Sequence, residues 1–196
     1  SHLASAESDL DFTARQTKRF ADIVRDVRAG GLHPAMVHLA NSAGIFTVHA
    51  PPLDGVRPGI LLYGLPPAAS LAQACAVQPS LSLRTRLEVI KDLPAGHGIG
   101  YGRTFVTGRP TRMGLIPIGY ADGYPRSLSN KARVIVGGHF APVVGRVSMD
   151  VVAIDVTDVP AAVPGDPVTL IGEQNGLRIT AVQLAELADT IAYEII

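Results

Sequence analysis

The hydrophobic pattern of the chain changes its period near residue 80, and this change limits the fold more than any other feature of the sequence. Before that point, apolar residues recur at helical spacing and are expected to form the buried face of a first helix: Phe20, Ile23, Val24 and Val27. Residues 35–40 then form a nearly continuous apolar run, which is typical of a parallel strand buried on both faces. After residue 80, short segments alternate apolar and polar residues. The pattern predicts an α/β part followed by a mostly β-strand part.

Turn and capping residues set the expected limits of the first part. Asp9 or Asp11 is expected to cap the first helix, and Gly30-Gly31 to supply the left-handed residue that ends it. Residues 65–80 carry three prolines and no charged residue, so we interpret them as a linker, with room for a short helix. The expected domains are therefore residues 1–76 and residues 77–196.

The second part is expected to form a small barrel or sandwich. Strands are predicted at residues 83–89, 113–118, 133–136, 142–147, 151–155 and 168–171. Near the end of the chain, Thr180 and Gln183 form a capping-box pattern that predicts a short helix carrying Leu184 and Leu187.

Composition excludes several classes of protein. With 47% hydrophobic residues the chain is too apolar to be disordered, and no apolar run approaches the ~18 residues of a membrane-spanning helix. Seventeen Lys and Arg balance seventeen Asp and Glu, so no charge excess favours nucleic acid or an anionic membrane. The single Cys75 allows neither an internal disulfide nor a zinc site, which indicates a reducing compartment such as the cytoplasm. A small molecule is the expected partner, and no metal ion is expected.

Two motifs in the first part are candidates for an anion site. Asn41 and Ser42 follow the first predicted strand, at the end where α/β folds place ligands, although an ordinary helix cap is favoured for this motif alone. Arg57 stands at the end of a second apolar strand, where it needs an anionic or polar partner, and the backbone of Gly59 and Ile60 could hold an anion. Together they fit a phosphate cradle of the kind that (β/α)₈ barrels build after their last strands. A structural Arg57 in an ion pair is an equally good interpretation of the second motif taken alone.

A third motif places an aromatic residue on a glycine-rich backbone. Tyr101 lies between Gly100 and Gly102, and the nearby Arg103 would favour the charged form of its phenol, which could then act as a base. A surface turn with a packed tyrosine is the simpler interpretation of this motif alone. Residues 119–125 and 148–150 are predicted only as turns.

Five motifs in this order and at these separations closely resemble the alanine racemase family: HLANSAG, VRPGILLYG, GYGRTF, PIGYADGYPR and VGRVSMD. The resemblance covers the whole chain. It implies the C-terminal end of a (β/α)₈ TIM barrel that binds pyridoxal 5'-phosphate (PLP), followed by a mostly β-strand domain. The implied activity is the interconversion of L-alanine and D-alanine, which supplies D-alanine for peptidoglycan, by proton transfer at Cα between two bases.

The resemblance assigns roles to residues at matching positions. One of the two bases is Tyr101, acting on the L-enantiomer. The implied cofactor-binding residues are His38, Asn41, Ser42, Arg57, Gly59, Ile60 and Tyr193. The implied substrate-side residues are Tyr120, Met149 and Asp150, which act across a homodimer interface in the partner's barrel.

The second base in the family is the lysine that binds PLP, and no lysine here matches it. Lys18 is expected on an exposed helix, Lys91 after a strand of the β domain, and Lys131 in a polar turn. We therefore expect the chain to be the C-terminal portion of a racemase, with PLP attached to a lysine outside it. Alone it should neither close a barrel nor racemise alanine.

Three other functions were weighed. A PLP-dependent decarboxylase of the same plan would pair the ring nitrogen with an acidic residue, and position 57 is Arg. A racemase with another amino-acid substrate is harder to exclude, because side-chain selectivity depends on the width of the substrate pocket. A non-catalytic binding module is supported only by the absent lysine.

Overall fold

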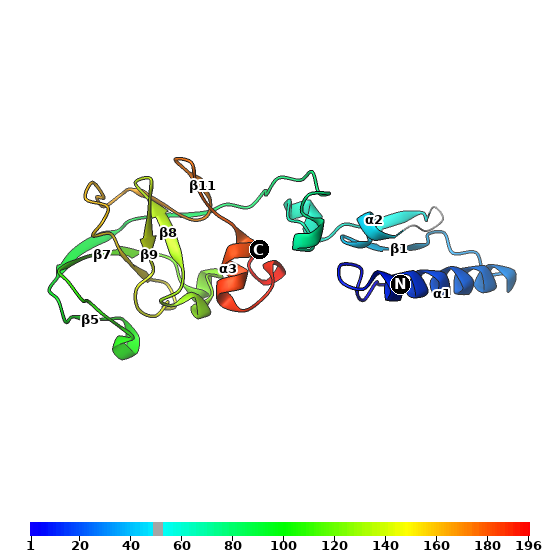
Figure 1. The fold of residues 1–196 in the computed structure, drawn as a ribbon, viewed down its shortest axis with the longest axis horizontal. Helices are drawn as coiled ribbons and strands as arrows, with labels where there is room; N and C mark the ends of the chain where they lie inside the picture. Colours follow the sequence, from blue (N-terminus) through cyan, green and yellow to red (C-terminus); the bar gives the residue numbers. More distant parts are fainter. Residues whose placement is uncertain (49–52) are drawn as a thin grey trace. The chain divides into compact units, whose positions relative to one another are not determined.

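The computed structural model describes residues 1–48 and 53–196, which divide into two compact units, Ser1–Ser80 and Leu81–Ile196 (Figure 1). The division falls where the hydrophobic pattern changes its period. The domain limits expected from the sequence, 1–76 and 77–196, stay a prediction about the family's domains.

The first unit contains a long helix and a two-stranded parallel sheet. Its elements are α1 (Leu10–Ala29), β1 (His38–Asn41), α2 (Gly44–Thr47), β2 (Gly55–Arg57) and the 3₁₀ turns η1 (Ile60–Tyr63) and η2 (Ala69–Leu71). Asp9 caps α1 as predicted, since its Oδ1 accepts a hydrogen bond from the Phe12 N–H at 2.8 Å. Gly31, at φ +84°, supplies the left-handed residue after the helix. The parallel pairing sets Asn41 beside Arg57 at the carboxyl ends of both strands.

The prediction of a buried face on α1 is wrong. Ile23 is 50% exposed, and Phe20, Val24 and Val27 are only partly buried. These side chains line an open groove of about 230 Å³ together with Met36 and its neighbours. Phe20 packs against the buried apolar cluster of this unit, whereas Ile23 stays exposed in the groove. Among the described residues, the buried apolar cluster of this unit contains Leu3, Ala6, Leu39 and Ala43, with Phe20 and three other partly buried residues packed against it.

Antiparallel sheets make up the second unit. One sheet has the order β10-β7-β4, a second has the order β12-β11-β8-β9 with β3 also paired to β11, and β5 pairs with β6. The strands are β3 (Leu83–Arg86), β4 (Val89–Leu93), β5 (Gly98–Ile99), β6 (Phe105–Val106), β7 (Thr111–Ile116), β8 (Arg133–Val136), β9 (His139–Pro142), β10 (Val152–Asp155), β11 (Pro167–Gln174) and β12 (Leu177–Ile179). The helical elements are η3 (Tyr101–Arg103), η4 (Tyr120–Asp122), η5 (Arg126–Leu128), α3 (Ala181–Ala188) and η6 (Ala192–Glu194).

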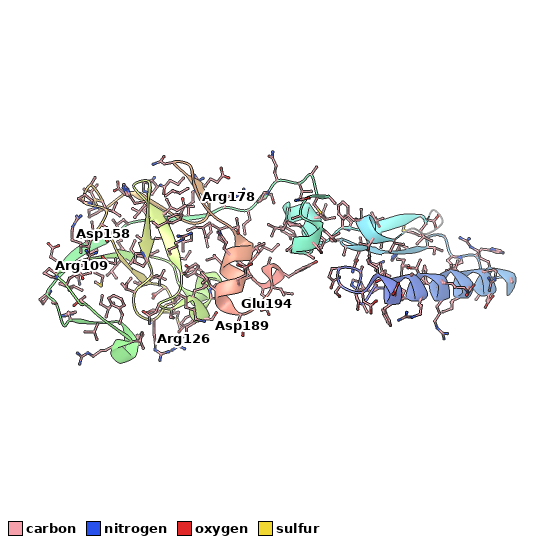
Figure 2. The ribbon with its side chains drawn as sticks, viewed as in Figure 1. Arg109, Arg126, Asp158, Arg178, Asp189 and Glu194 are labelled. Atoms are coloured by element: carbon pink, nitrogen blue, oxygen red, sulfur yellow. The ribbon has the colours of Figure 1, made fainter. Side chains whose placement is uncertain are left out.

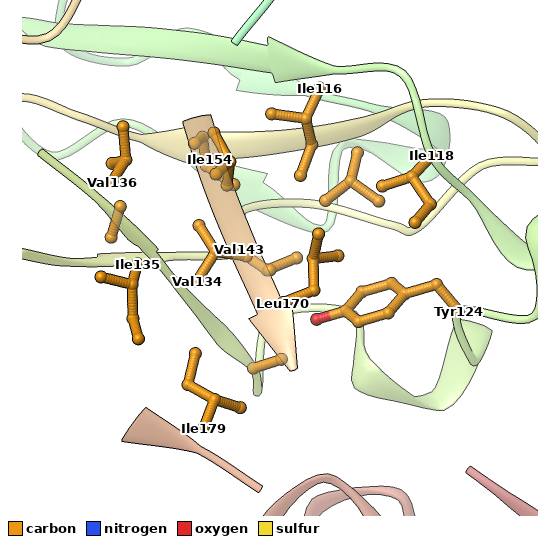
Figure 3. Close-up of a cluster of buried hydrophobic side chains, with 14 of the residues drawn as sticks. Ile116, Ile118, Tyr124, Val134, Ile135, Val136, Val143, Ile154, Leu170 and Ile179 are labelled. Carbon is orange, nitrogen blue, oxygen red and sulfur yellow. The ribbon is translucent and has the colours of Figure 1, made fainter. Parts of the chain in front are cut away.

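Alternating side chains from these strands form one continuous apolar core (Figure 3). Ile116 from β7, Ile154 from β10 and Leu170 from β11 are all fully buried. On the surface, Arg109 and Asp158 form an ion pair of 2.6 Å between the turns before β7 and after β10 (Figure 2). The second unit therefore has a core of its own.

Most predicted strands of the second unit are confirmed, with two corrections. The predicted strand at 83–89 is two strands, β3 and β4, and Lys91 lies inside β4 and not after it. The prediction at 142–147 is wrong beyond Pro142, because Val143 makes only an isolated bridge and Gly145 turns into the left-handed region at φ +80°. The short β5, β6 and β12 and residues 139–141 of β9 were not predicted.

The final helix begins as the sequence predicts. The Gln183 N–H donates to Thr180 Oγ1 at 3.1 Å, and Gln183 Oε1 accepts from the Thr180 N–H at 2.9 Å. Leu184 on α3 is buried in the core, whereas Leu187 is partly exposed. Among the described residues, no helix is both long and apolar enough to cross a lipid bilayer.

Candidate functional site

Asn41 and Ser42 have different roles at the end of β1. Asn41 Oδ1 accepts a hydrogen bond from the Gly44 N–H at 2.9 Å, and its Nδ2 donates to the Leu3 carbonyl at 3.3 Å. Asn41 thus bonds to the first residue of α2 across the turn, but the N-cap itself is Ala43, which makes no side-chain cap bond, so the helix-cap prediction is wrong. Ser42 is only 3% exposed. A hydroxyl buried at the end of a parallel strand stands where α/β folds bind ligands.

The two candidate anion motifs meet at Ser42 and Gly59. A Cβ built on Gly59 would lie 4.0 Å from Ser42 Oγ, so the hydroxyl faces a backbone that has no side chain. Ile60, which is buried, begins η1 directly after Gly59. The Gly59 N–H donates to the Arg57 carbonyl at 3.0 Å, whereas the Ile60 N–H stands at the start of the helical turn, where the first N–H groups have no partner within the turn. A hydroxyl, a bare backbone and a turn start together suit an anion with several oxygens.

Arg57 contacts His38 from the neighbouring strand. Its guanidinium bonds to His38 Nδ1, and it also donates to the carbonyls of Ser1 at 2.5 Å and Leu39 at 3.5 Å. Because a guanidinium can only donate, Nδ1 must accept, which places the proton of a neutral His38 ring on Nε2. No salt bridge involves Arg57 among residues 1–48 and 53–196, so the ion-pair interpretation is not supported.

In the second unit, Tyr101 stands on an exposed loop. The residue is 73% exposed at the start of η3, between Gly100 and Gly102, whose φ angles are +69° and +71°. This exposure excludes a tyrosine packed in a surface turn. The side chain of Arg103 lies over Gly98, where a Cβ would be 2.3 Å from Nε.

Tyr120 and Met149 are joined through their backbones. The Tyr120 N–H donates to the Ser148 carbonyl at 3.0 Å, and the Ala121 N–H donates to the Met149 carbonyl at 2.8 Å. A Cβ on Gly119 would lie 2.3 Å from both carbonyl oxygens, so only glycine fits this crossing. Sequence patterns predicted both segments only as turns, and the one signal of their contact was the glycine itself.

A second close approach joins the Tyr101 loop to the same region. A Cβ on Gly145 would lie 2.9 Å from the Ile99 carbonyl oxygen, and one on Gly100 would lie 3.3 Å from the Arg146 nitrogen. The second unit thus gathers the loops of four exposed or partly exposed side chains: Tyr101, Tyr120, Met149 and Asp150. We refer to these loops, residues 98–104, 119–122 and 145–150, as the tyrosine loops.

Tyr193 lies near the end of the second unit. It is half-exposed within η6, whereas the other residues that the resemblance assigns to the cofactor lie in the first unit. Within the described parts of the chain, no group of three or more His, Cys, Asp or Glu side chains is arranged to hold a metal ion.

Two family models match the chain. The model described as "Alanine racemase, C-terminal domain" matches residues 80–196, and "Alanine racemase, N-terminal domain" matches residues 1–67. The alanine racemase of Syntrophobacter fumaroxidans is 46% identical over 196 residues, which are 100% of this chain and 52% of that protein. The alanine racemase of Halothermothrix orenii is 45% identical with the same coverage. The chain spans about half the length of the curated relatives it matches.

Solved structures agree with these matches. The alanine racemase from Bacillus anthracis with bound L-Ala-P has a TM-score of 0.91 and 36% identity, over 99% of this chain and 50% of that one. The alanine racemase from D-cycloserine-producing Streptomyces lavendulae has a TM-score of 0.92 and 35% identity, over 100% of this chain and 52% of that one.

Proposed function

Because the chain belongs to the alanine racemase family, we propose that it forms part of a PLP-dependent enzyme that interconverts L-alanine and D-alanine. The proposed enzyme is a cytoplasmic homodimer that supplies D-alanine for peptidoglycan. The observation that carries the proposal is Tyr101, an exposed phenol between two left-handed glycines, on a loop that contacts residues 145 and 146 just before Met149.

The first unit fits the phosphate of PLP. Ser42 Oγ and the bare backbone at Gly59 form a cradle that a Cβ would fill. In the proposed complex the Ser42 hydroxyl, the Ile60 N–H and the bare backbone of Gly59 hold the phosphate, with Asn41 fixing the turn before them. Tyr193 is proposed as a further phosphate ligand.

Arg57 is proposed to face the ring nitrogen of the cofactor. When bound, PLP withdraws electrons from the substrate Cα and makes its proton acidic. Arg57 donates a hydrogen bond but no proton, since a guanidinium stays protonated. The ring nitrogen would then stay neutral, which favours return of the proton to Cα over transamination. His38 fixes the guanidinium from the neighbouring strand.

Tyr101 is proposed to remove the proton from Cα of L-alanine through its phenol oxygen. A lysine outside residues 1–196 would serve the opposite face. The three lysines present do not fit that role: Lys18 pairs with Asp22, Lys131 donates to the Leu187 carbonyl, and Lys91 lies within β4. Tyr120, Met149 and Asp150 are proposed to line the substrate side of the site in the partner copy.

Proton exchange tests the role of Tyr101. In the native full-length protein, Tyr101→Phe should slow exchange of the Cα proton of L-alanine with deuterated solvent by about 10²–10⁴-fold, the usual contribution of a positioned base. Exchange from D-alanine should fall much less. Tyr63→Phe, at an exposed tyrosine of the first unit, is the matched control and should leave both rates unchanged. Equal losses from both enantiomers would contradict the assignment.

Mixed dimers test the sharing of the site. A Tyr101→Phe copy paired with an Arg57→Ala copy would form one site with both native residues if Tyr101 acts on the partner. Co-expression should then restore activity above that of either variant alone. No restoration would contradict a shared site.

The isolated segment gives a further test. Residues 1–196 incubated with PLP should not racemise alanine, because none of their lysines fits the proposed second base. Turnover comparable to that of a full-length relative would contradict this part of the proposal.

A further inference from the structure

Asn130 lies between the tyrosine loops and has an uncommon backbone conformation. It follows η5 with φ +59°, a left-handed angle that asparagine accepts more readily than most residues. The residue is exposed, so its side chain adds nothing to the apolar core.

The side chain of Asn130 forms hydrogen bonds to two of the tyrosine loops, residues 98–104 and residues 145–150. Its Oδ1 accepts a hydrogen bond from the Gly145 N–H at 2.6 Å. Its Nδ2 donates to Thr104 Oγ1 at 3.2 Å, directly after the η3 turn that begins with Tyr101. Next to it, Ser129 Oγ accepts from the Val147 N–H at 3.0 Å. Residues 129 and 130 therefore hold the loop of Tyr101 and the loop of Met149 from one side.

The two loops also approach each other closely at glycines, with the Arg146 side chain lying near Gly102. Gly100 lies against the Arg146 nitrogen and Gly145 against the Ile99 carbonyl. Two left-handed glycines, Gly100 and Gly102, flank Tyr101, so its loop has more conformational freedom than an ordinary turn. A carboxamide that bonds to Thr104 and Gly145 at once removes much of that freedom.

We propose that Asn130 is a positioning residue, which fixes the Tyr101 phenol by tying residue 104 to residue 145. This rests on the proposed function, in which the phenol oxygen takes the proton from L-alanine. A displacement of about 1 Å at a reacting group can cost up to about 10²-fold in rate, so loss of the tie should be visible in the chemical step.

The chain offers a matched control in Asn175. This residue is also left-handed, at φ +50°, in the turn between β11 and β12. Its side chain lies beside Gly138 and makes no hydrogen bond to the tyrosine loops among the described residues. Glycine at either position keeps the left-handed backbone without strain and removes only the side chain.

The experiment compares Asn130→Gly with Asn175→Gly in the native full-length protein loaded with PLP. For Asn130→Gly, Cα exchange from L-alanine should fall about tenfold and exchange from D-alanine less than about threefold. Asn175→Gly should change neither rate, and the two variants should unfold at similar temperatures. Asn130→Asp keeps the acceptor for the Gly145 N–H and should recover part of the lost rate.

Adding Asn130→Gly to Tyr101→Phe should cause no further loss of L-alanine exchange, since both changes act through one phenol. If Tyr101→Phe shows the preference for L-alanine and Asn130→Gly does not, the positioning role is wrong and the proposed function stands. If neither variant shows the preference, both proposals are wrong. An equal loss from both enantiomers in Asn130→Gly alone would indicate a merely structural residue and overturn the positioning role.

Discussion

The two units bury their apolar residues very differently. In the second unit, residues from Leu87 to Leu184 form one continuous core. In the described part of the first unit the buried apolar cluster has four members, while Leu32 is 68% exposed and Leu62 is 73% exposed. The second unit satisfies its own hydrophobic pattern, whereas the first has faces that nothing in the described chain covers. A local pattern such as the apolar face of α1 (Phe20, Ile23, Val24 and Val27) therefore predicts burial that the described chain does not provide.

Expressing the two units separately should reveal the largest difference in their stability. Residues 81–196 alone should unfold in one cooperative transition, because their core is complete within that range. Residues 1–80 alone should show no cooperative transition and should bind a dye for exposed apolar surface. Thermal circular dichroism and dye fluorescence on the two fragments test this. A sharp transition from residues 1–80 would remove the contrast.

Truncating one leucine in each unit should give the next effect. Leu170→Ala in the second core should lower the free energy of unfolding by about 2–5 kcal/mol, since it leaves a cavity among packed side chains. Leu62→Ala in the first unit removes an exposed side chain. It should change the free energy of unfolding of residues 1–196 by less than about 0.5 kcal/mol. Urea unfolding of both variants measures the difference, and comparable losses would contradict it.

Alanine substitutions at two glycines of the second unit compare a position packed against backbone with a position that faces open space. Gly119→Ala would place Cβ 2.3 Å from two carbonyl oxygens and should destabilise the unit by about 1–3 kcal/mol. Gly108→Ala meets nothing within 4 Å and is the control, with little expected change. Chemical shifts of residues 119–121 and 148–149 should move only in the first variant.

Removing an exposed ion pair should have the smallest effect on the stability of either unit. The hydrogen bond from Arg109 holds the pKa of Asp158 below its usual 3.8, and the hydrogen bond from Lys18 does the same to the pKa of Asp22. A depressed folded-state pKa means that each pair stabilises above pH ~4 and that this contribution is lost as the pH falls further.

Substitution at each aspartate separates the two pairs. Asp158→Asn should slightly reduce the fall in melting temperature of the second unit between about pH 5 and pH 2. Asp22→Asn should leave that transition unchanged, because its partners lie within α1. Calorimetry across this pH range measures both effects, and a change in the second unit on Asp22→Asn would show that the pairs are not independent.

Local signals predicted the elements whose causes lie within a few residues. The Asp9 cap, the capping box of Thr180 and Gln183, and most strands of the second unit follow from spacing and hydrogen-bonding groups close in sequence. The family matches confirm the expected fold class, a portion of the racemase barrel followed by a mostly β domain.

Structural features that depend on contacts with residues distant in sequence could not be predicted from local patterns. The open face of α1 depends on what packs against it, and the end of β9 at Pro142 depends on the approach of Gly145 to the Ile99 carbonyl. Ser42 and Gly59 were each ambiguous alone, and their proximity follows from the parallel pairing of β1 and β2. Asn130 belongs to no sequence motif, and its role follows from side-chain hydrogen bonds to Thr104 and Gly145, which are distant in sequence.

The crossing at Gly119 has a consequence for how this protein can diversify. The bonds from Tyr120 to Ser148 and from Ala121 to Met149 run entirely through main-chain atoms. They are therefore indifferent to the side chains at positions 120 and 149, which both point away from the core. A library randomised at these two positions would therefore change exposed side chains on an unchanged scaffold. If these side chains line the substrate side as proposed, selection would alter substrate preference without first having to restore the fold.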